Sequence, residues 1–335
     1  MISRTMRRNL GFAAGLLLRR PFSVLVQVTN RCNMTCSFCG FWPTALSPDA
    51  ELSVAEYERI ADELAALGCF LVSIEGGEPF LRPDLVDIVR AFGRRHVPVL
   101  YTNGWFVERE PAQALFAAGL MQAGVSIDYS EAQRHDAKRG RTGAFEKAWQ
   151  AVAHLRAAAP HGGRQVHVMT VLMQDNQDDI EKLLQLSARH GVAHHITLLA
   201  TSGDRRQKGP DALPEPSVVE ELRRLRRRYR HFRVPRSYLQ GVDAFLSGGL
   251  LPTCRAGLQS FNIDHVGNVA PCIERIGSAV GNVRTEPLGV LWARLRTLNA
   301  GAQCQDCWTL CRGFAQMLSG GRGLRRLADL AALMP

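Results

Sequence analysis

The sequence predicts an α/β fold in which six short strands alternate with helices along the first two-thirds of the chain. Three observations lead to this prediction: short apolar runs bounded by turn residues, amphipathic helical patterns between them, and polar or glycine-rich residues directly after successive strands. Repeated strand–helix units form parallel sheets, either as a partial barrel or as an open doubly wound sheet. Both arrangements are compatible with the pattern alone.

The six predicted strands are rich in β-branched and other apolar residues. They are expected at Ser23–Thr29, Phe70–Glu75, Val97–Thr102, Gln122–Asp128, Gln165–Leu172 and His194–Leu199. The helices between them are expected at Ser53–Leu67, Pro83–Arg95, Pro111–Ala118, Ala144–Ala157 and Gln177–His190. The first of these helices has a complete start signal, because Ser53 can act as the N-cap and Glu56 stands three residues later.

Residues suited to ligand binding follow four of the predicted strands. Three cysteines follow the first strand, and the segment Gly76-Gly77-Glu78-Pro79 follows the second. Thr102-Asn103-Gly104 ends the third strand, and Ser126 and Asp128 close the fourth. In both candidate folds ligands bind at the C-terminal ends of the strands. Four loops are therefore predicted to converge on one ligand site.

The net charge of +10 comes from arginine spread along the whole chain, since only four of the 41 basic residues are lysine. The densest basic run is Glu221–Arg230, in which Leu222, Leu225 and Tyr229 recur at helical spacing. This pattern favours a surface helix with a solvated basic face over a docking site for an anionic partner. No nucleic-acid partner is predicted.

The N-terminal residues 1–20 place basic residues around the apolar patch Leu10–Leu18. The patch is too short to span a bilayer, and Arg19-Arg20 stand where a signal peptide would have a small-residue cleavage site. A basic helix packed on the protein is expected here, with a weak contact to a membrane surface as the alternative. The protein is predicted to be cytoplasmic.

The nine cysteines fall into two groups and one isolated residue, Cys69. Such clustering indicates metal sites in a reducing cytoplasm rather than disulfides. In the first group, Cys32, Cys36 and Cys39 can wrap one loop around one cluster. Zinc usually takes four ligands, and a ferredoxin run supplies a fourth cysteine before proline. With three thiolates, one iron of a cubane cluster would stay open to another ligand.

The segment from Thr29 to Gly40, with Phe38 before its last cysteine, resembles the signature of the radical SAM superfamily. Gly76-Gly77-Glu78-Pro79 resembles the second motif of that family. The resemblance implies a partial (β/α)6 barrel with a 4Fe-4S cluster on the three cysteines and S-adenosylmethionine (SAM) on the open iron. It also implies reductive cleavage of SAM to a 5′-deoxyadenosyl radical, which abstracts a hydrogen from the substrate.

The same resemblance implies roles for residues around SAM. Phe38 would lie beside the adenine, and Gly76, Gly77 and Glu78 would receive the methionine amino group. Ser126 and Asp128 would contact the ribose or the carboxylate, and Arg139 would pair with the carboxylate. For these last three residues the alternative is an ordinary surface arginine or a capping polar group.

The C-terminal third is predicted to hold a second cluster. Cys254 and Cys272 flank a predicted β-hairpin at Phe261–Asp264 and Asn268–Ala270, and Cys304 and Cys307 form a Cys-x-x-Cys pair. This region resembles the SPASM extension or its shorter form, Twitch. A full SPASM extension carries seven cysteines and two clusters, whereas this region has five cysteines. The resemblance therefore implies one auxiliary 4Fe-4S cluster on these four cysteines. Cys311 is a substitute ligand, a redox or acid–base catalytic thiol, or a bystander. A zinc site on the same four cysteines is the alternative to the cluster.

Four parts of the chain are therefore expected. They are an N-terminal basic helix (1–20), a radical SAM partial barrel (21–235), a small α+β iron–sulfur domain (236–315) and a C-terminal helical tail (316–335). Pro235–Leu251, which contains Gly248-Gly249, is expected to be a linker.

The resemblance implies oxidation or another modification of a small molecule or a peptide in a biosynthetic pathway, with a flavodoxin- or ferredoxin-type electron donor. The auxiliary cluster would accept an electron or bind the substrate. One alternative is a ribosomal-peptide maturase that uses a separate leader-binding protein, and adenosyl transfer to an apolar acceptor is another. A non-enzymatic iron–sulfur electron carrier is a third, which the glycine-rich second motif counts against.

Overall fold

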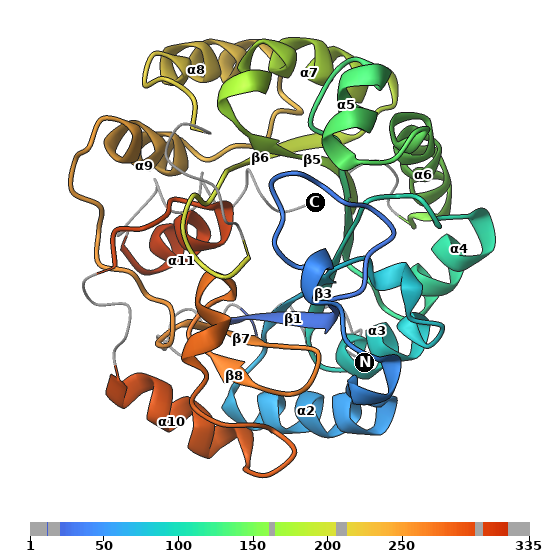
Figure 1. Ribbon diagram of the computed structural model, residues 1–335, viewed down its shortest axis with the longest axis vertical. Coiled ribbons are helices and arrows are strands. Elements are labelled where there is room, and N and C mark those ends of the chain that lie inside the picture. The colour runs from blue at the N-terminus through green and yellow to red at the C-terminus, as the bar shows by residue number, and fades with distance from the viewer. Residues whose placement is uncertain (1–11, 13–20, 161–164, 206–212, 299–303, 321–335) are drawn as a thin grey trace, which may run out of the picture.

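The computed structural model describes residues 12, 21–160, 165–205, 213–298 and 304–320. Its centre is one sheet of eight strands in the order β6-β5-β4-β3-β2-β1-β7-β8. Strands β1 to β6 run parallel, each beside its neighbour in the sequence. The sheet curves around the middle of the molecule and the helices form an outer ring (Figure 1). The predicted partial (β/α)6 barrel is confirmed.

All six predicted strands form, with ends within two residues of those expected. The strands are β1 (Ser23–Thr29), β2 (Leu71–Gly76), β3 (Val97–Thr102), β4 (Gln122–Ser126), β5 (Val166–Leu172), β6 (Ala193–Leu198), β7 (Ser260–Ile263) and β8 (Val269–Ala270). The helices are α2 (Val54–Leu67), α3 (Leu85–Gly93), α4 (Arg109–Ala117), α5 (Ala132–Arg139), α6 (Ala144–Ala158), α7 (Ile180–Arg189), α8 (Val218–Arg228), α9 (Arg236–Leu246), α10 (Leu288–Leu298) and α11 (Leu310–Gly320). The capping box of Ser53 and Glu56 starts α2 as predicted.

The main hydrophobic core lies between the sheet and the outer helices. Alternate residues of β1, such as Val24 and Val26, are fully buried there together with Ile60 of α2 and Ile88 of α3. Because side chains alternate along a strand, the residues between them, such as Gln27, face the inside of the barrel. The packed outer layer thus fixes the strands, and the loops at their C-terminal ends carry the candidate site.

The C-terminal region extends the sheet of the barrel. Strand β7 pairs in parallel with β1, and β8 pairs with β7 in the predicted antiparallel hairpin. The linker predicted at Pro235–Leu251 is wrong, because α9 occupies most of it. This helix buries Tyr238 and Val242 in a second core that also contains Trp308. The pair Gly248-Gly249, which suggested a linker, lies just beyond the end of α9.

Both predicted terminal segments lie largely outside the described residues, apart from Phe12 and the residues up to 320. None of the helices in the described ranges is long and apolar enough to cross a membrane.

The basic run is helix α8, and its arginines pair mainly with nearby acids. Arg224 and Arg228 both contact Glu181 of α7, at 2.6 and 2.7 Å, and Arg223 contacts Asp243 of α9 at 2.8 Å. These pairs support the prediction of a surface helix.

Candidate active site

The loop that follows β1 carries the first group of cysteines across the C-terminal end of the barrel. Its backbone is attached to the end of α5, since Thr35 and Ser37 donate hydrogen bonds to the carbonyls of Arg139 and Lys138 at 3.1 and 3.2 Å. Burial raises the pKa of Cys32 to about 12, and the charges of Glu78 and the other two cysteines add to this. Three thiolates placed together in this way need a compensating cation, which iron would supply.

The donor set fits a cluster with one open iron. All nine cysteines are free thiols. Among the described residues, no three Cys, His, Asp or Glu side chains converge closely enough to hold a single metal ion. A cubane cluster has a different requirement, because each thiolate binds a separate iron. Three cysteines on one loop meet that requirement and leave one iron for another ligand.

The glycine pair after β2 lies directly against the cysteine loop. The backbone N–H groups of Gly77 and Glu78 donate to the carbonyls of Thr29 and Arg31 at 2.7 and 2.9 Å. A Cβ atom on Gly76 would lie 2.1 Å from the Thr29 carbonyl oxygen, and one on Gly77 would lie 2.0 Å from that of Arg31. Only glycine allows this approach at either position. The second motif is therefore held beside the first by backbone contact.

Glu78 is fully buried, and both of its carboxylate oxygens have partners within the protein. Oε1 accepts from the Thr102 hydroxyl at 2.7 Å and from the Phe80 N–H at 3.1 Å, and Oε2 accepts from the Asn103 N–H at 2.7 Å. Burial raises the pKa of this carboxyl to about 7. The side chain therefore ties the end of β2 to the end of β3.

Replacing Glu78 with glutamine is expected to destabilise this edge of the barrel and to weaken SAM binding. The new NH2 group must face either the Asn103 N–H or the Phe80 N–H, which leaves a buried donor unpaired at a cost of about 1–3 kcal/mol. Chemical denaturation measures the first effect and equilibrium binding of SAM the second. Unchanged stability together with unchanged SAM affinity would contradict this role.

Asp128 and Arg139 form a buried ion pair beside the cysteine loop. Asp128 lies just beyond β4 and accepts from Arg139 Nη2 at 2.5 Å and from the Val171 N–H at 2.9 Å. Arg139 lies over the Phe38 ring, 5.4 Å from its centroid, and its Nη1 is 3.9 Å from Cys36 Sγ. Its Nε is buried without a hydrogen-bond partner in the described part of the chain. One N–H donor is thus left for a ligand next to the cysteines.

Asp128→Asn is expected to lower the free energy of unfolding by about 3–5 kcal/mol, because it leaves the buried Arg139 charge without its partner. Glu181→Gln is the matched control, since it removes a carboxylate that pairs with arginine on the exposed face of α7. That variant should change stability little. Urea denaturation of both proteins makes the comparison. An equal effect of the two substitutions would show that the buried Asp128–Arg139 pair contributes no more to the free energy of unfolding than an exposed pair.

Ser126 is the last residue of β4 and is half-buried there. The structure therefore brings five features to one end of the barrel: the cysteine loop, the glycine pair, Glu78, Ser126 and the Asp128–Arg139 pair. Helix α5, which supplies Arg139, was not predicted. Its eight residues are mostly polar and lack an apolar stripe, so periodicity gave no signal for it.

The second group of cysteines gathers around Cys272, which follows β8 and the hairpin. Burial raises the pKa of Cys272 well above its usual range, and the nearby thiolates of Cys307, Cys311 and Cys254 raise it further. Burial also raises the pKa of Cys304, with a contribution from the charge of Cys254. The thiols of Cys254, Cys307 and Cys311 are therefore near Cys272, and Cys304 is near Cys254. A donor set of this kind fits a four-thiolate cluster.

Cys311 differs from the other four because its side chain is accessible. It lies in the first turn of α11, and its Sγ is 3.0 Å from the Thr309 hydroxyl. Burial nonetheless raises its pKa to about 11, and its thiol is close enough to Glu75 of β2 and to Arg205 to be affected by their charges. Burial raises the pKa of Cys307 and the charge of Cys311 raises it further, so the Cys311 thiol is close both to the second group of cysteines and to Glu75 and Arg205.

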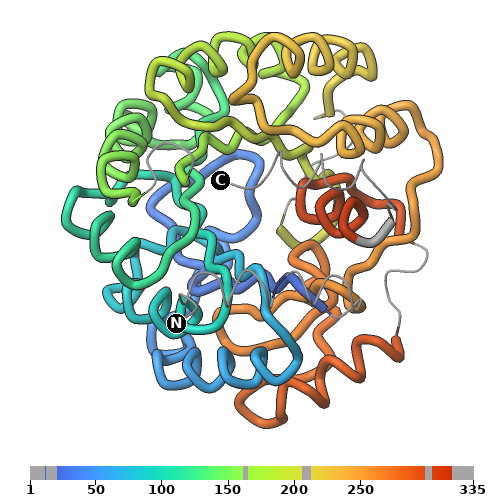
Figure 2. Tube along the Cα trace, turned by 180° about the vertical axis from the view of Figure 1, so that it is seen from behind, coloured from blue at the N-terminus to red at the C-terminus, as the bar shows by residue number. Residues whose placement is uncertain are grey.

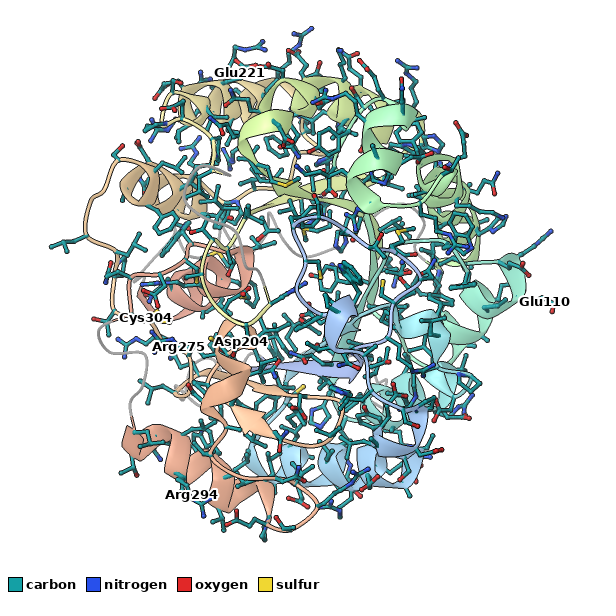
Figure 3. All side chains as sticks on the ribbon, viewed as in Figure 1. Glu110, Asp204, Glu221, Arg275, Arg294 and Cys304 are labelled. Atoms are coloured by element: carbon teal, nitrogen blue, oxygen red, sulfur yellow. The ribbon has the colours of Figure 1, made fainter. Side chains whose placement is uncertain are left out.

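Residues 201–205, the loop that follows β6, connect the two groups of cysteines and were not singled out in the sequence. The Gly40 N–H, next to Cys39, donates to the Arg205 carbonyl at 2.7 Å. The Asp204 N–H donates to the Glu274 carbonyl at 3.0 Å, and the Ser202 hydroxyl donates to the Asp306 carbonyl at 3.2 Å. Figure 3 labels Asp204 near Arg275 and Cys304. The position of this loop after the sixth strand is the sequence signal that could have identified it.

Comparison with known proteins agrees with this geometry. The radical SAM superfamily matches residues 26–187, and the SPASM iron-sulfur cluster-binding domain matches residues 254–308. The AdoMet-dependent heme synthase of Methanosarcina barkeri is 29% identical over 303 residues, which cover 81% of this chain and 82% of that protein. The mycofactocin maturase MftC of Mycobacterium tuberculosis is 30% identical over 311 residues, which cover 88% and 78%.

Among solved structures, anSMEcpe with bound AdoMet superposes with a TM-score of 0.64 at 15% identity, and the match covers 93% of this chain and 96% of that one. The chain belongs to the radical SAM superfamily and carries a SPASM iron–sulfur region. It is an enzyme. Its cofactors are a 4Fe-4S cluster that binds SAM, SAM itself and an auxiliary iron–sulfur cluster. A non-enzymatic electron carrier is therefore not the correct description.

Proposed function

We propose that this enzyme oxidises a small-molecule or peptide substrate held inside the barrel between the two groups of cysteines. Cys32, Cys36 and Cys39 would hold the SAM-binding cluster, and Cys254, Cys272, Cys304 and Cys307 the auxiliary one. The observation that carries the proposal is the loop of residues 201–205. It contacts Gly40 beside the first group and both Glu274 and Asp306 beside the second, so a substrate near this loop lies close to both.

When bound, the cluster and SAM supply an electron and a 5′-deoxyadenosyl group that takes one hydrogen atom from the substrate. The residues of this chain hold the reacting groups in place. The unpartnered Nε of Arg139 would donate to the SAM carboxylate, and its pairing with Asp128 keeps the guanidinium in position. Phe38 beneath the same guanidinium would lie next to the adenine. Backbone groups of Gly76 and Gly77 would meet the methionine amino group, and Ser126 the ribose.

Net oxidation follows from the two-centre arrangement. After losing a hydrogen atom to the adenosyl carbon, the substrate must lose one electron and one proton to become a stable product. The electron would pass to the auxiliary cluster, and the proton to a base or to water. Two electrons leave the substrate in total, and SAM is consumed as methionine and 5′-deoxyadenosine. A flavodoxin- or ferredoxin-type protein would supply the initial electron.

The relatives do not select between substrate classes, because a heme synthase and a maturase match this chain at nearly the same identity. A peptide maturase that uses a separate leader-binding protein is therefore the second candidate. The similarity to the maturase supports it.

The test of the proposed function is an anaerobic assay of the reconstituted protein with dithionite and SAM. Equal amounts of 5′-deoxyadenosine and methionine are expected. Reduced flavodoxin should replace dithionite as the electron source. A protein that is loaded with iron and sulfide, but forms no 5′-deoxyadenosine with either reductant, would contradict the proposal.

A further inference from the structure

The inside of the barrel contains an ion pair that the SAM chemistry does not use. Arg205, from the loop after β6, contacts Glu75 of β2 through Nη1 at 3.1 Å. Its guanidinium lies over the Phe41 ring, 5.7 Å from the centroid, and its backbone carbonyl is bonded to Gly40. These contacts hold the guanidinium in one orientation. The pair therefore has the fixed geometry expected of a binding group.

The pair lies between the two groups of cysteines. The charges of Glu75 and Glu274 act on Arg205, and so do those of Cys39 from the first group and Cys311 from the second. This is the region in which the proposed function places the substrate.

Arg205 has an unused donor in this space. Its Nε is buried and has no hydrogen-bond partner among the residues that the structure describes. In a guanidinium group the Nε–H and one Nη2–H point in the same direction and match the two oxygens of a carboxylate. A buried N–H without a partner is unfavourable in a native structure and is normally satisfied by a ligand or water.

We propose that the Nε/Nη2 edge of Arg205 binds a carboxylate group of the substrate, and that Glu75 positions the guanidinium for this contact. This inference rests on the proposed function and names the chemical class of its substrate: a small molecule or peptide with a free carboxylate. Bidentate binding at this point fixes one end of the substrate between the two cysteine groups and sets which carbon faces the adenosyl group.

The carboxylate could also be that of SAM, and Arg205 could instead serve only to balance the charge of the thiolates. The test uses benzoate as the probe carboxylate and benzamide as its neutral counterpart. Isothermal titration of the reconstituted holoenzyme compares wild type with Arg205→Lys and Arg205→Ala, each with and without saturating SAM. Arg90→Lys is the matched control, because Arg90 pairs with Asp87 on the exposed face of α3.

Benzoate is expected to bind the wild type and Arg90→Lys equally, with and without SAM, and benzamide at least about tenfold more weakly. Arg205→Lys keeps the positive charge but loses the two-donor edge, so it should weaken benzoate binding by about tenfold or more. Three results would overturn the inference: equal binding of benzoate and benzamide, wild-type benzoate affinity in Arg205→Lys, or displacement of benzoate by SAM. Formation of 5′-deoxyadenosine by the wild type is measured separately and tests the proposed function alone.

Discussion

The triple variant Cys32→Ala, Cys36→Ala, Cys39→Ala is expected to lose all cleavage of SAM while it keeps about four of the wild type's about eight irons. The reason is the separation of the two thiolate groups. The first group lies on one loop after β1, whereas the second is assembled from the segments after α9 and β8 and before α11. Removal of the first group leaves every side chain of the second unchanged.

Iron and sulfide analysis after anaerobic reconstitution, together with the assay for 5′-deoxyadenosine, measures both effects. Cys69→Ala is the control variant. Cys69 lies before β2, away from both groups, and its Sγ is 3.3 Å from the Arg95 carbonyl. This control should retain about eight irons and full cleavage. A wild-type preparation with one cluster and one zinc would contradict the expected auxiliary cluster, and a triple variant without iron would contradict its independence.

Sequence periodicity predicted the six strands of the barrel well because every strand is a local apolar run that the helices then cover. β1 and β3 even have the predicted ends, since turn residues bound both runs. The same approach missed α5 and treated α9 as a linker. In α9, Tyr238 and Val242 are buried against a segment that includes Trp308, about 70 residues later in the chain, and local patterning does not report such distant packing.

In the candidate site, too, local sequence features were predicted and contacts between distant residues were not. The spacing of Cys32, Cys36 and Cys39 identified the first cluster loop, because chelation by one loop is encoded locally. The sequence did not predict how the Glu78 carboxylate is held: it accepts hydrogen bonds from Thr102 and Asn103 at the end of the neighbouring strand. Arg205 had no motif around it. Its importance depends on the distances to Glu75 and to the two cysteine groups, which follow from the closure of the barrel rather than from neighbouring residues.

Cys311→Ala is expected to retain the auxiliary cluster, whereas Cys272→Ala is expected to lose it. Five thiols compete for four positions, because each iron of a cubane takes one protein thiolate. Burial raises the pKa of Cys272, and the charges of Cys307, Cys311 and Cys254 raise it further, so this thiol is near three of the other candidate ligands. Cys311 is the accessible one. Its hydrogen-bond partner is Thr309, and the charges that act on it include those of Glu75 and Arg205 inside the barrel. We therefore expect this thiol to face the substrate rather than to bind the auxiliary cluster.

The measurement uses single substitutions of each C-terminal cysteine in the triple-variant background, so that all remaining iron reports on the auxiliary group. Cys311→Ala should keep about four irons, and Cys254→Ala, Cys272→Ala, Cys304→Ala and Cys307→Ala should each fall towards zero. Electron paramagnetic resonance of the reduced proteins separates a bound cluster from loosely held iron. The rival arrangement uses Cys304, Cys307 and Cys311 with one upstream cysteine. It predicts the reverse: loss of iron in Cys311→Ala and retention in either Cys254→Ala or Cys272→Ala.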